Sequence, residues 1–161
     1  MFSNAMESIR SIESLDRLAS RYGHATLRSQ PPGRRGPVLA YVPTYEALED
    51  AAGMARDSYL CVVEGSTSMA GWASAVGAED LLRPGQTAAP LDPDLAKELD
   101  SLVFYGNNGW GDQFGKQQAR RLLANLRPEW RDSAIICGYM LAKGRSAQGV
   151  KNLTKIMEKA A

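Results

Sequence analysis

The chain has 161 residues, of which 44% are hydrophobic and 23% are charged, so it is long enough for one globular domain and too apolar for wholesale disorder. Its longest apolar run, residues 134–142, is far shorter than the roughly 20 residues that cross a bilayer. The N-terminus also lacks the apolar core of a secretory signal. The composition therefore predicts a soluble, cytoplasmic protein without a membrane segment.

Charge is segregated along the chain, although the net charge is only +1. Residues 1–36 carry 6 Lys/Arg and 3 Asp/Glu, residues 37–100 carry 3 and 11, and residues 101–161 carry 10 and 4. An acidic middle and a basic end indicate that the basic part contacts nucleic acid or an acidic protein surface. Alternatively, the two parts face each other within the fold or across a homo-oligomer.

The N-terminal region is predicted to be one amphipathic helix with a lead-in, over residues 1–30. Apolar residues recur at intervals of three and four between residues 8 and 22, and Gly23 is expected to end the helix. The run Ser3-Asn4-Ala5-Met6 is typical of a remnant of an expression vector, so no function is assigned to residues 1–5. Residues 31–37 are rich in proline and glycine and predict a linker.

Two apolar runs with β-branched residues, at residues 38–42 and 59–63, predict strands. Thr44 is a suitable N-cap for a helix between them. A strand, a helix and a second strand make a βαβ unit, in which the strands pair in parallel. We therefore predict an α/β fold with a small sheet that contains this unit and a mainly helical C-terminal half; an α+β fold is the alternative.

Four helices are predicted towards the C-terminus, over about 93–105, 112–126, 128–143 and 146–159. Asp92 followed by Pro93 is a typical helix start, and Ser146 is a good N-cap. We expect residues 38–161 to form a single α/β domain that ends in a helical bundle over about 93–161. The residues expected to be buried in the bundle are Leu99, Leu102, Leu123, Ile135, Leu141, Leu153 and Met157.

A run rich in glycine and asparagine precedes the helix that is expected to start near residue 112. Glycine and asparagine tolerate positive φ, so Asn107, Asn108 and Gly109 predict a ligand loop that presents backbone N–H groups. Trp110 could stack on exposed bases. The following helix adds basic residues to this candidate binding surface: Lys116, Arg120 and Arg121. The alternative is a purely structural turn between two helices.

The last helix carries a second candidate binding surface. Lys151, Lys155 and Lys159 recur every four residues and therefore share one face, with Gln148 and Asn152 beside them. Such a face could follow phosphates and reach base edges. A solvated face is the alternative. The two helices before and after Gly144 resemble a helix-turn-helix only loosely, because the first is predicted to be long and Met140 replaces a small residue.

Glu64 is a weak catalytic candidate, since it follows a predicted strand at the edge of a parallel sheet where ligands bind. Catalysis would need a partner such as Asp50, Asp80 or His24, and capping of the next turn is the alternative. His24 has no cysteine or carboxylate at ligand spacing, so no metal site is predicted. The cysteines Cys61 and Cys137 are interpreted as buried free thiols.

We favour a non-enzymatic binding or regulatory protein whose basic C-terminal helices contact nucleic acid or an acidic partner. The first alternative is a small α/β enzyme or ligand-binding protein with its site at the strand ends near Glu64. The second is an oligomeric structural or interaction protein. No acid/base pair is identifiable, so the sequence favours a protein that is not an enzyme, and no cofactor is predicted.

Overall fold

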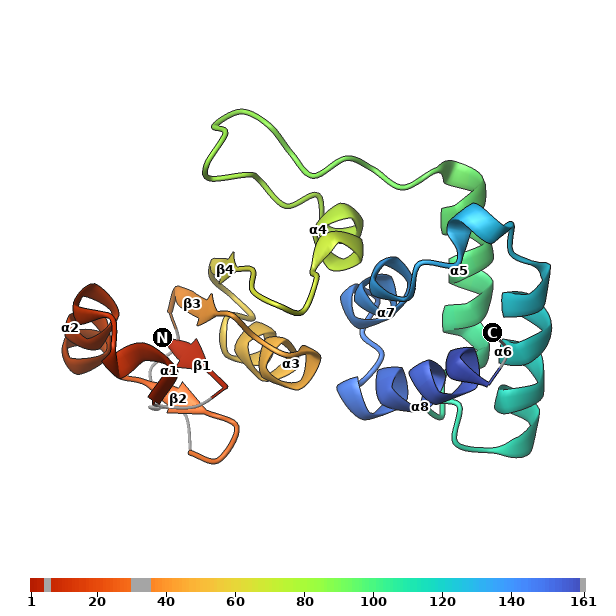
Figure 1. Ribbon diagram of the computed structural model, residues 1–161, viewed down its shortest axis with the longest axis horizontal. Helices are drawn as coiled ribbons and strands as arrows, with labels where there is room; N and C mark the ends of the chain where they lie inside the picture. Colours follow the sequence, from red (N-terminus) through yellow and green to blue (C-terminus); the bar gives the residue numbers. More distant parts are fainter. Residues whose placement is uncertain (5–6, 30–35, 160–161) are drawn as a thin grey trace. The chain divides into compact units, whose positions relative to one another are not determined.

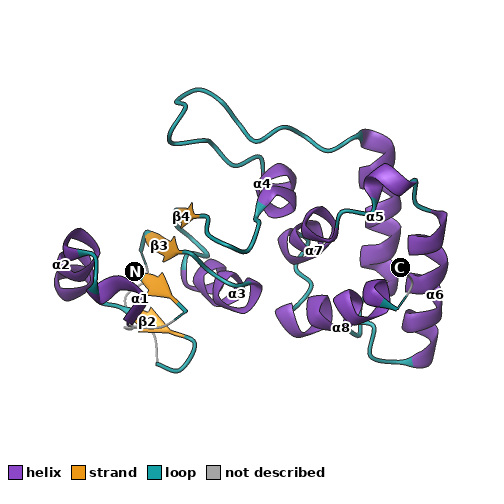
Figure 2. Ribbon diagram, in the orientation of Figure 1, coloured by secondary structure: helices purple, strands orange, loops and turns teal. Residues whose placement is uncertain are grey.

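The computed structural model describes residues 1–4, 7–29 and 36–159, and its internal contacts divide the chain into two compact units, Met1–Thr67 and Ser68–Ala161 (Figure 1). The first unit holds a four-stranded parallel sheet, and the second consists of helices (Figure 2). The predicted α/β fold class with a mainly helical C-terminal half is confirmed. The compact units divide after Thr67, whereas the sequence places the start of the main domain at residue 38. Most of the predicted linker lies outside the described residues.

The sheet of the first unit has the order β2-β1-β3-β4, and all its strands are parallel. The strands are β1 Phe2–Ser3, β2 Ala25–Thr26, β3 Val38–Tyr41 and β4 Leu60–Val63. The predicted βαβ unit is confirmed, because β3 and β4 pair in parallel on either side of helix α3, Tyr45–Met54. Thr44 caps this helix as expected and accepts a hydrogen bond from the Ala47 backbone N–H at 3.3 Å.

Residues 2 and 3, to which the sequence analysis assigns no function, form strand β1. Phe2 and Ser3 form a central strand that pairs with both β2 and β3, and both residues are buried. Phe2 packs with Ala25, Val38 and Ala40 in the core between the sheet and α3. A strand of two residues shows no periodicity, so the sequence pattern could not reveal it. Residues 5 and 6 lie outside the described part of the chain.

The single N-terminal helix predicted over residues 8–22 is also corrected. It is divided into α1, Glu7–Arg10, and α2, Glu13–Tyr22. Ile12 has an extended conformation, with φ −115° and ψ 101°, and its N–H donates to the Ile9 carbonyl, so the helix cannot continue through it. The expected end at Gly23 is confirmed. The apolar spacing is the same on both sides of the break and therefore does not signal it.

The second unit contains five α-helices among its described residues: α4 Ala70–Val76, α5 Pro93–Tyr105, α6 Gln113–Asn125, α7 Ser133–Ala142 and α8 Ala147–Glu158. The helix predicted over 128–143 is shorter than expected. Pro128–Trp130 forms a separate 3₁₀ turn, and the Asp132 carboxylate then caps α7 by accepting from the Ala134 and Ile135 backbone N–H groups.

Two glycines allow α4 and α7 to pack very closely. A Cβ atom on Gly71 would lie 2.1 Å from the Ile135 carbonyl oxygen, and one on Gly138 would lie 2.5 Å from the Trp72 backbone nitrogen.

Of the seven residues expected to be buried in the bundle, five are buried, and Ile135 and Met157 are only partly so. The helical faces were therefore predicted largely in the correct phase.

Within the described part of the chain, no helix is long and apolar enough to cross a membrane. The same residues contain no group of three or more His, Cys, Asp or Glu side chains that could hold a metal ion. Both cysteines are free: Cys137 is buried as expected, and Cys61 is only partly buried. Burial raises the pKa of the Cys137 thiol, so it stays protonated at neutral pH.

Candidate functional site

Helices α7 and α8 are joined by a tight turn, Lys143 to Ser146. Gly144 adopts a left-handed conformation with φ 79°, its N–H donates to the Leu141 carbonyl, and the Arg145 N–H donates to the Met140 carbonyl, both at 3.0 Å. These two bonds make the Schellman motif that commonly ends a helix. Ser146 then caps α8 by accepting from the Gly149 N–H at 3.1 Å. The turn is therefore fixed by hydrogen bonds at both ends.

The sequence differs from a helix-turn-helix in two ways, the length of the first helix and the presence of Met140, and the structure removes the first difference. The predicted first helix was too long, but α7 begins at Ser133 and has 10 residues, followed by the turn and the 12 residues of α8. The other departure remains, because Met140 is fully buried where a small residue is usual. Val150 and Leu153 of α8 are buried against the rest of the unit, which leaves the opposite face of α8 outward.

The outward face of α8 carries the predicted lysines. Lys151 and Lys155 lie on α8, Lys159 is its C-cap residue, and all three are exposed. Gln148 is also exposed and donates through Nε2 to the Asn152 Oδ1 at 3.3 Å. We call these five residues the α8 face. It combines three cations with two amides on the second helix of a helix-turn-helix-like pair.

Asn152 is oriented by a second bond, because its Nδ2 donates to the Gly109 carbonyl at 3.0 Å. Gly109 and Gly149 lie in backbone contact: a Cβ atom on Gly109 would be 3.1 Å from the Gly149 Cα. The predicted ligand loop therefore supports the N-terminal half of α8. Asn108 remains exposed and donates to the Asp112 carboxylate at 3.4 Å. These contacts favour the structural alternative for this loop.

The prediction that Trp110 stacks on bases is wrong, because its side chain is fully buried. Trp110 and Gly109 both have positive φ, 52° and 61°, so the chain turns back and places the ring against Gly106. A Cβ atom on Gly106 would lie 2.2 Å from a ring carbon of Trp110. The ring is therefore part of the packing between the loop and α8, and no base can reach it.

Arg145 is a residue whose role the sequence did not reveal. From the turn before α8, its Nη1 donates to the Gly106 carbonyl and to the Asn107 Oδ1, both at 3.3 Å. The guanidinium thus fastens the α7-α8 turn to the loop between α5 and α6. These partners lie 38 and 39 residues away in the sequence, so no local pattern could signal the contact.

The basic residues predicted on α6 occupy two flanks of that helix. Lys116 and Arg120 are four residues apart and share one flank, whereas Arg121 lies on another. Both arginines are exposed and Lys116 is half-buried. At the start of α6, the Asp112 carboxylate accepts from the Gly115 N–H at 2.7 Å, and this bond is the main reason why the Asp112 pKa is lowered. The helix start is occupied by this carboxylate, which disfavours an anion there.

Glu64 lies directly after β4, exposed at the carboxyl edge of the sheet. At the same edge Asn4 follows β1; it donates to the Val42 carbonyl at 2.8 Å and accepts from the Thr44 N–H at 3.0 Å. Val42 has a positive φ of 41°, which is unusual for a β-branched residue.

Two of the three partners that catalysis at Glu64 would need, His24 and Asp80, contact other residues. His24 contacts the buried Ser3, with 2.9 Å between Nε2 and Oγ. Asp50 is an exposed residue of α3, and Asp80 forms an ion pair with Arg83 at 2.9 Å within its own loop. Neither of these two contacts involves Glu64.

Comparison of the chain with protein-family models, with curated proteins and with solved structures finds no match.

Proposed function

We propose that the protein is a nucleic-acid-binding protein whose α8 face docks on the phosphate backbone and the groove of a duplex. The observation that carries this proposal is the exposed row of Lys151, Lys155 and Lys159 on the second helix of a tightly fixed helix-turn-helix-like pair. In helix-turn-helix proteins the second helix enters the major groove. Lysines contribute phosphate contacts, and amides such as that of Gln148 read base edges.

The supports of α8 favour a binding role over a merely solvated helix. A recognition element works best when its own position is fixed before the ligand arrives. Ser146 caps α8, Arg145 ties the turn before α8 to the loop before α6, and Asn152 holds α8 against Gly109. The basic character of the surrounding region, 10 Lys/Arg against 4 Asp/Glu over residues 101–161, adds attraction for phosphate.

The test is a binding assay with duplex DNA, single-stranded DNA and RNA across a salt series. The triple variant Lys151→Gln, Lys155→Gln, Lys159→Gln should keep the fold, since these positions are exposed and glutamine is a comparable helix former. Affinity should fall, and the slope of log affinity against log salt should become shallower by about one unit for each phosphate that the variant no longer neutralises.

A matched control removes the same number of positive charges from exposed positions elsewhere: Arg28→Gln, Arg56→Gln, Lys97→Gln. Its salt slope should stay close to that of the wild type. If the wild-type protein binds no nucleic acid at low salt, or if both triple variants lose affinity equally, the proposal fails. An acidic protein surface would then be the partner to test against the α8 face.

A ligand site at the carboxyl edge of the sheet is the second candidate function. Ligands of parallel sheets bind beyond the carboxyl ends of the strands where the strand order reverses, and the order β2-β1-β3-β4 reverses between β1 and β3. Asn4 and Glu64 both lie at this edge.

Self-association and a cytoplasmic location stay predictions.

A further inference from the structure

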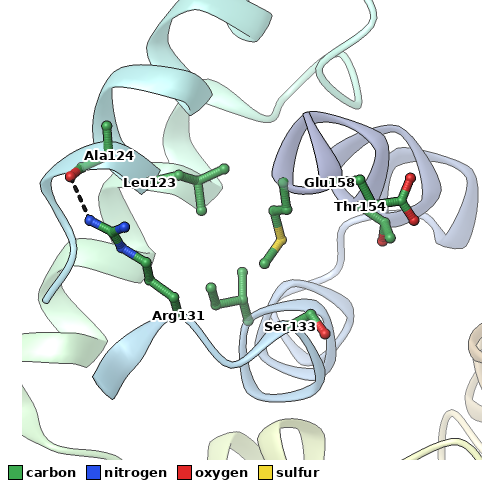
Figure 3. A pocket seen from close by; sticks show the side chains of 8 residues that line it. Leu123, Ala124, Arg131, Ser133, Thr154 and Glu158 are labelled. Atoms are coloured by element: carbon green, nitrogen blue, oxygen red, sulfur yellow. Dashed lines mark hydrogen bonds between the residues drawn. The ribbon is translucent and has the colours of Figure 1, made fainter. Parts of the chain in front are cut away.

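A pocket of about 510 Å³ opens in the second unit, where α6, α7 and α8 meet (Figure 3). This volume is within the range of small-molecule sites, about 300–1,000 Å³. The α8 lysines are not among the residues that line it. An inference about this pocket therefore does not depend on the proposed nucleic-acid binding.

The floor of the pocket is apolar. It includes Leu123 of α6 and Ile136 of α7, both buried, and Met157 of α8, which is partly exposed. The sequence predicts a buried Met157, and its exposure coincides with the pocket. Covering this floor with an apolar molecule would remove hydrocarbon surface from water, which favours binding.

The rim is charged on two sides. Figure 3 shows Arg131 on one side of the pocket, with Glu158 and Thr154 on the opposite side. Arg131 is held in place by its own backbone contacts, because Nε donates to the Leu126 carbonyl at 3.1 Å and Nη2 donates to the Ala124 carbonyl at 2.9 Å. A guanidinium has five N–H donors, so further donors remain for a ligand.

We propose that this pocket binds a small amphipathic carboxylate, with its carboxylate at Arg131 and its apolar body on Leu123, Ile136 and Met157. A guanidinium is well suited to a carboxylate, because charge-assisted hydrogen bonds between the two are short and strong. Glu158 on the opposite side repels a carboxylate and so disfavours the reversed orientation.

Decanoate is a suitable probe, and the methyl carbon of Met157 is a local reporter. In protein labelled with ¹³C at the methionine methyl groups, titration with decanoate should shift the Met157 signal and leave Met54 in place. Ala124→Trp should abolish the shift, because Ala124 lines the pocket and the indole would fill it. Ala52→Trp, at an exposed position on α3, is the matched control and should bind as the wild type does.

The charge requirement is tested on the wild-type protein first. Decanoate should bind about tenfold more tightly than decanol, because one charge-assisted bond to Arg131 distinguishes the two probes. Arg131→Gln should remove the advantage of decanoate over decanol while a melting curve confirms that the variant folds. An unmoved Met157 signal, binding that survives Ala124→Trp, or equal affinity for decanoate and decanol would overturn the proposal.

Discussion

The two units of this chain depend on contacts between residues at different separations along the sequence. In the helical unit, each α-helix from α5 to α8 begins at a side-chain cap that is local to it: Asp92, Asp112, Asp132 and Ser146. In the sheet unit, the central strand β1 has two residues, and its partners lie more than 20 residues away. Local signals thus define the helical unit, whereas long-range pairing defines the sheet.

The units also differ in how their candidate sites are made. The α8 face is a set of side chains at helical spacing on one element, so the sequence alone indicates it. The carboxyl edge of the sheet joins Asn4, Val42 and Glu64 from three strands, and its composition depends on the strand order. A surface on one helix can therefore be proposed from a sequence, while a site between strands needs the topology.

The largest effect that separates the units is expected from Trp110→Ala. The ring is fully buried against Gly106 and near Gly149, so its removal should cost about 3–5 kcal/mol of unfolding free energy. The second unit should become less stable, while the Met54 methyl signal in the first unit should keep its unfolding midpoint in urea. Trp130→Ala is the control: this ring is only partly buried and lies under the Arg127 guanidinium, so about 1 kcal/mol is expected.

If Trp110→Ala shifts the unfolding of Met54 by as much as that of Met140, the two units unfold as one. The two units would then differ in architecture but not in stability.

A smaller effect is expected from Gly71→Ala at the crossing of α4 and α7. The new methyl group would meet the Ile135 backbone, which cannot move without separating the helices, so about 3 kcal/mol of destabilisation is expected. Gly53→Ala in α3 has no atom within 4 Å and should gain up to about 1 kcal/mol from helix propensity. Urea unfolding monitored by circular dichroism measures both, and a neutral Gly71→Ala would show that the crossing is looser than described.

The cap of α8 gives a third and weaker test. Ser146→Ala removes the acceptor of the Gly149 N–H and should cost about 1 kcal/mol. Ser146→Asn should restore most of it, since asparagine caps equally well. If the α8 face binds nucleic acid, Ser146→Ala should also weaken binding more than Ser146→Asn does, because fraying of α8 would loosen its first turn.

Much of the helical unit could be predicted because caps and apolar spacing are local. Asp92 and Ser146 were identified as caps, and Leu99, Leu102 and Leu153 as buried. The start of α7 was misplaced because Pro128 is a good first helical residue, although here it opens a 3₁₀ turn. Asp132, four residues later, is the local cap at which α7 begins.

The parts that could not be predicted depend on distant contacts. Strands β1 and β2 exist because Phe2 and Ala25 complete the core over α3, and neither shows strand periodicity. Arg145 and Asn152 gain their roles from the loop around Gly109, some 40 residues earlier. An indole ring can stack on bases when it is exposed, but the left-handed backbone conformation of Trp110 turns its ring inward.

The smallest expected effect is a pH dependence confined to the sheet unit. Burial, with a smaller contribution from the nearby N-terminal ammonium, lowers the pKa of His24 below its ordinary value near 6.5. In the charged ring both nitrogens are donors, yet Nδ1 is buried with no acceptor among the described residues. The unfolded chain therefore binds the proton more readily, and stability should fall as the pH decreases through 6.5 towards the folded-state pKa, then level off.

The urea midpoint of the Met54 signal should be lower at pH 5.5 than at pH 7.5, and His24→Gln should reduce that difference, since His24 is the only histidine. An equal difference in His24→Gln would assign the pH dependence to other groups and leave the His24 contact with Ser3 without a measurable role.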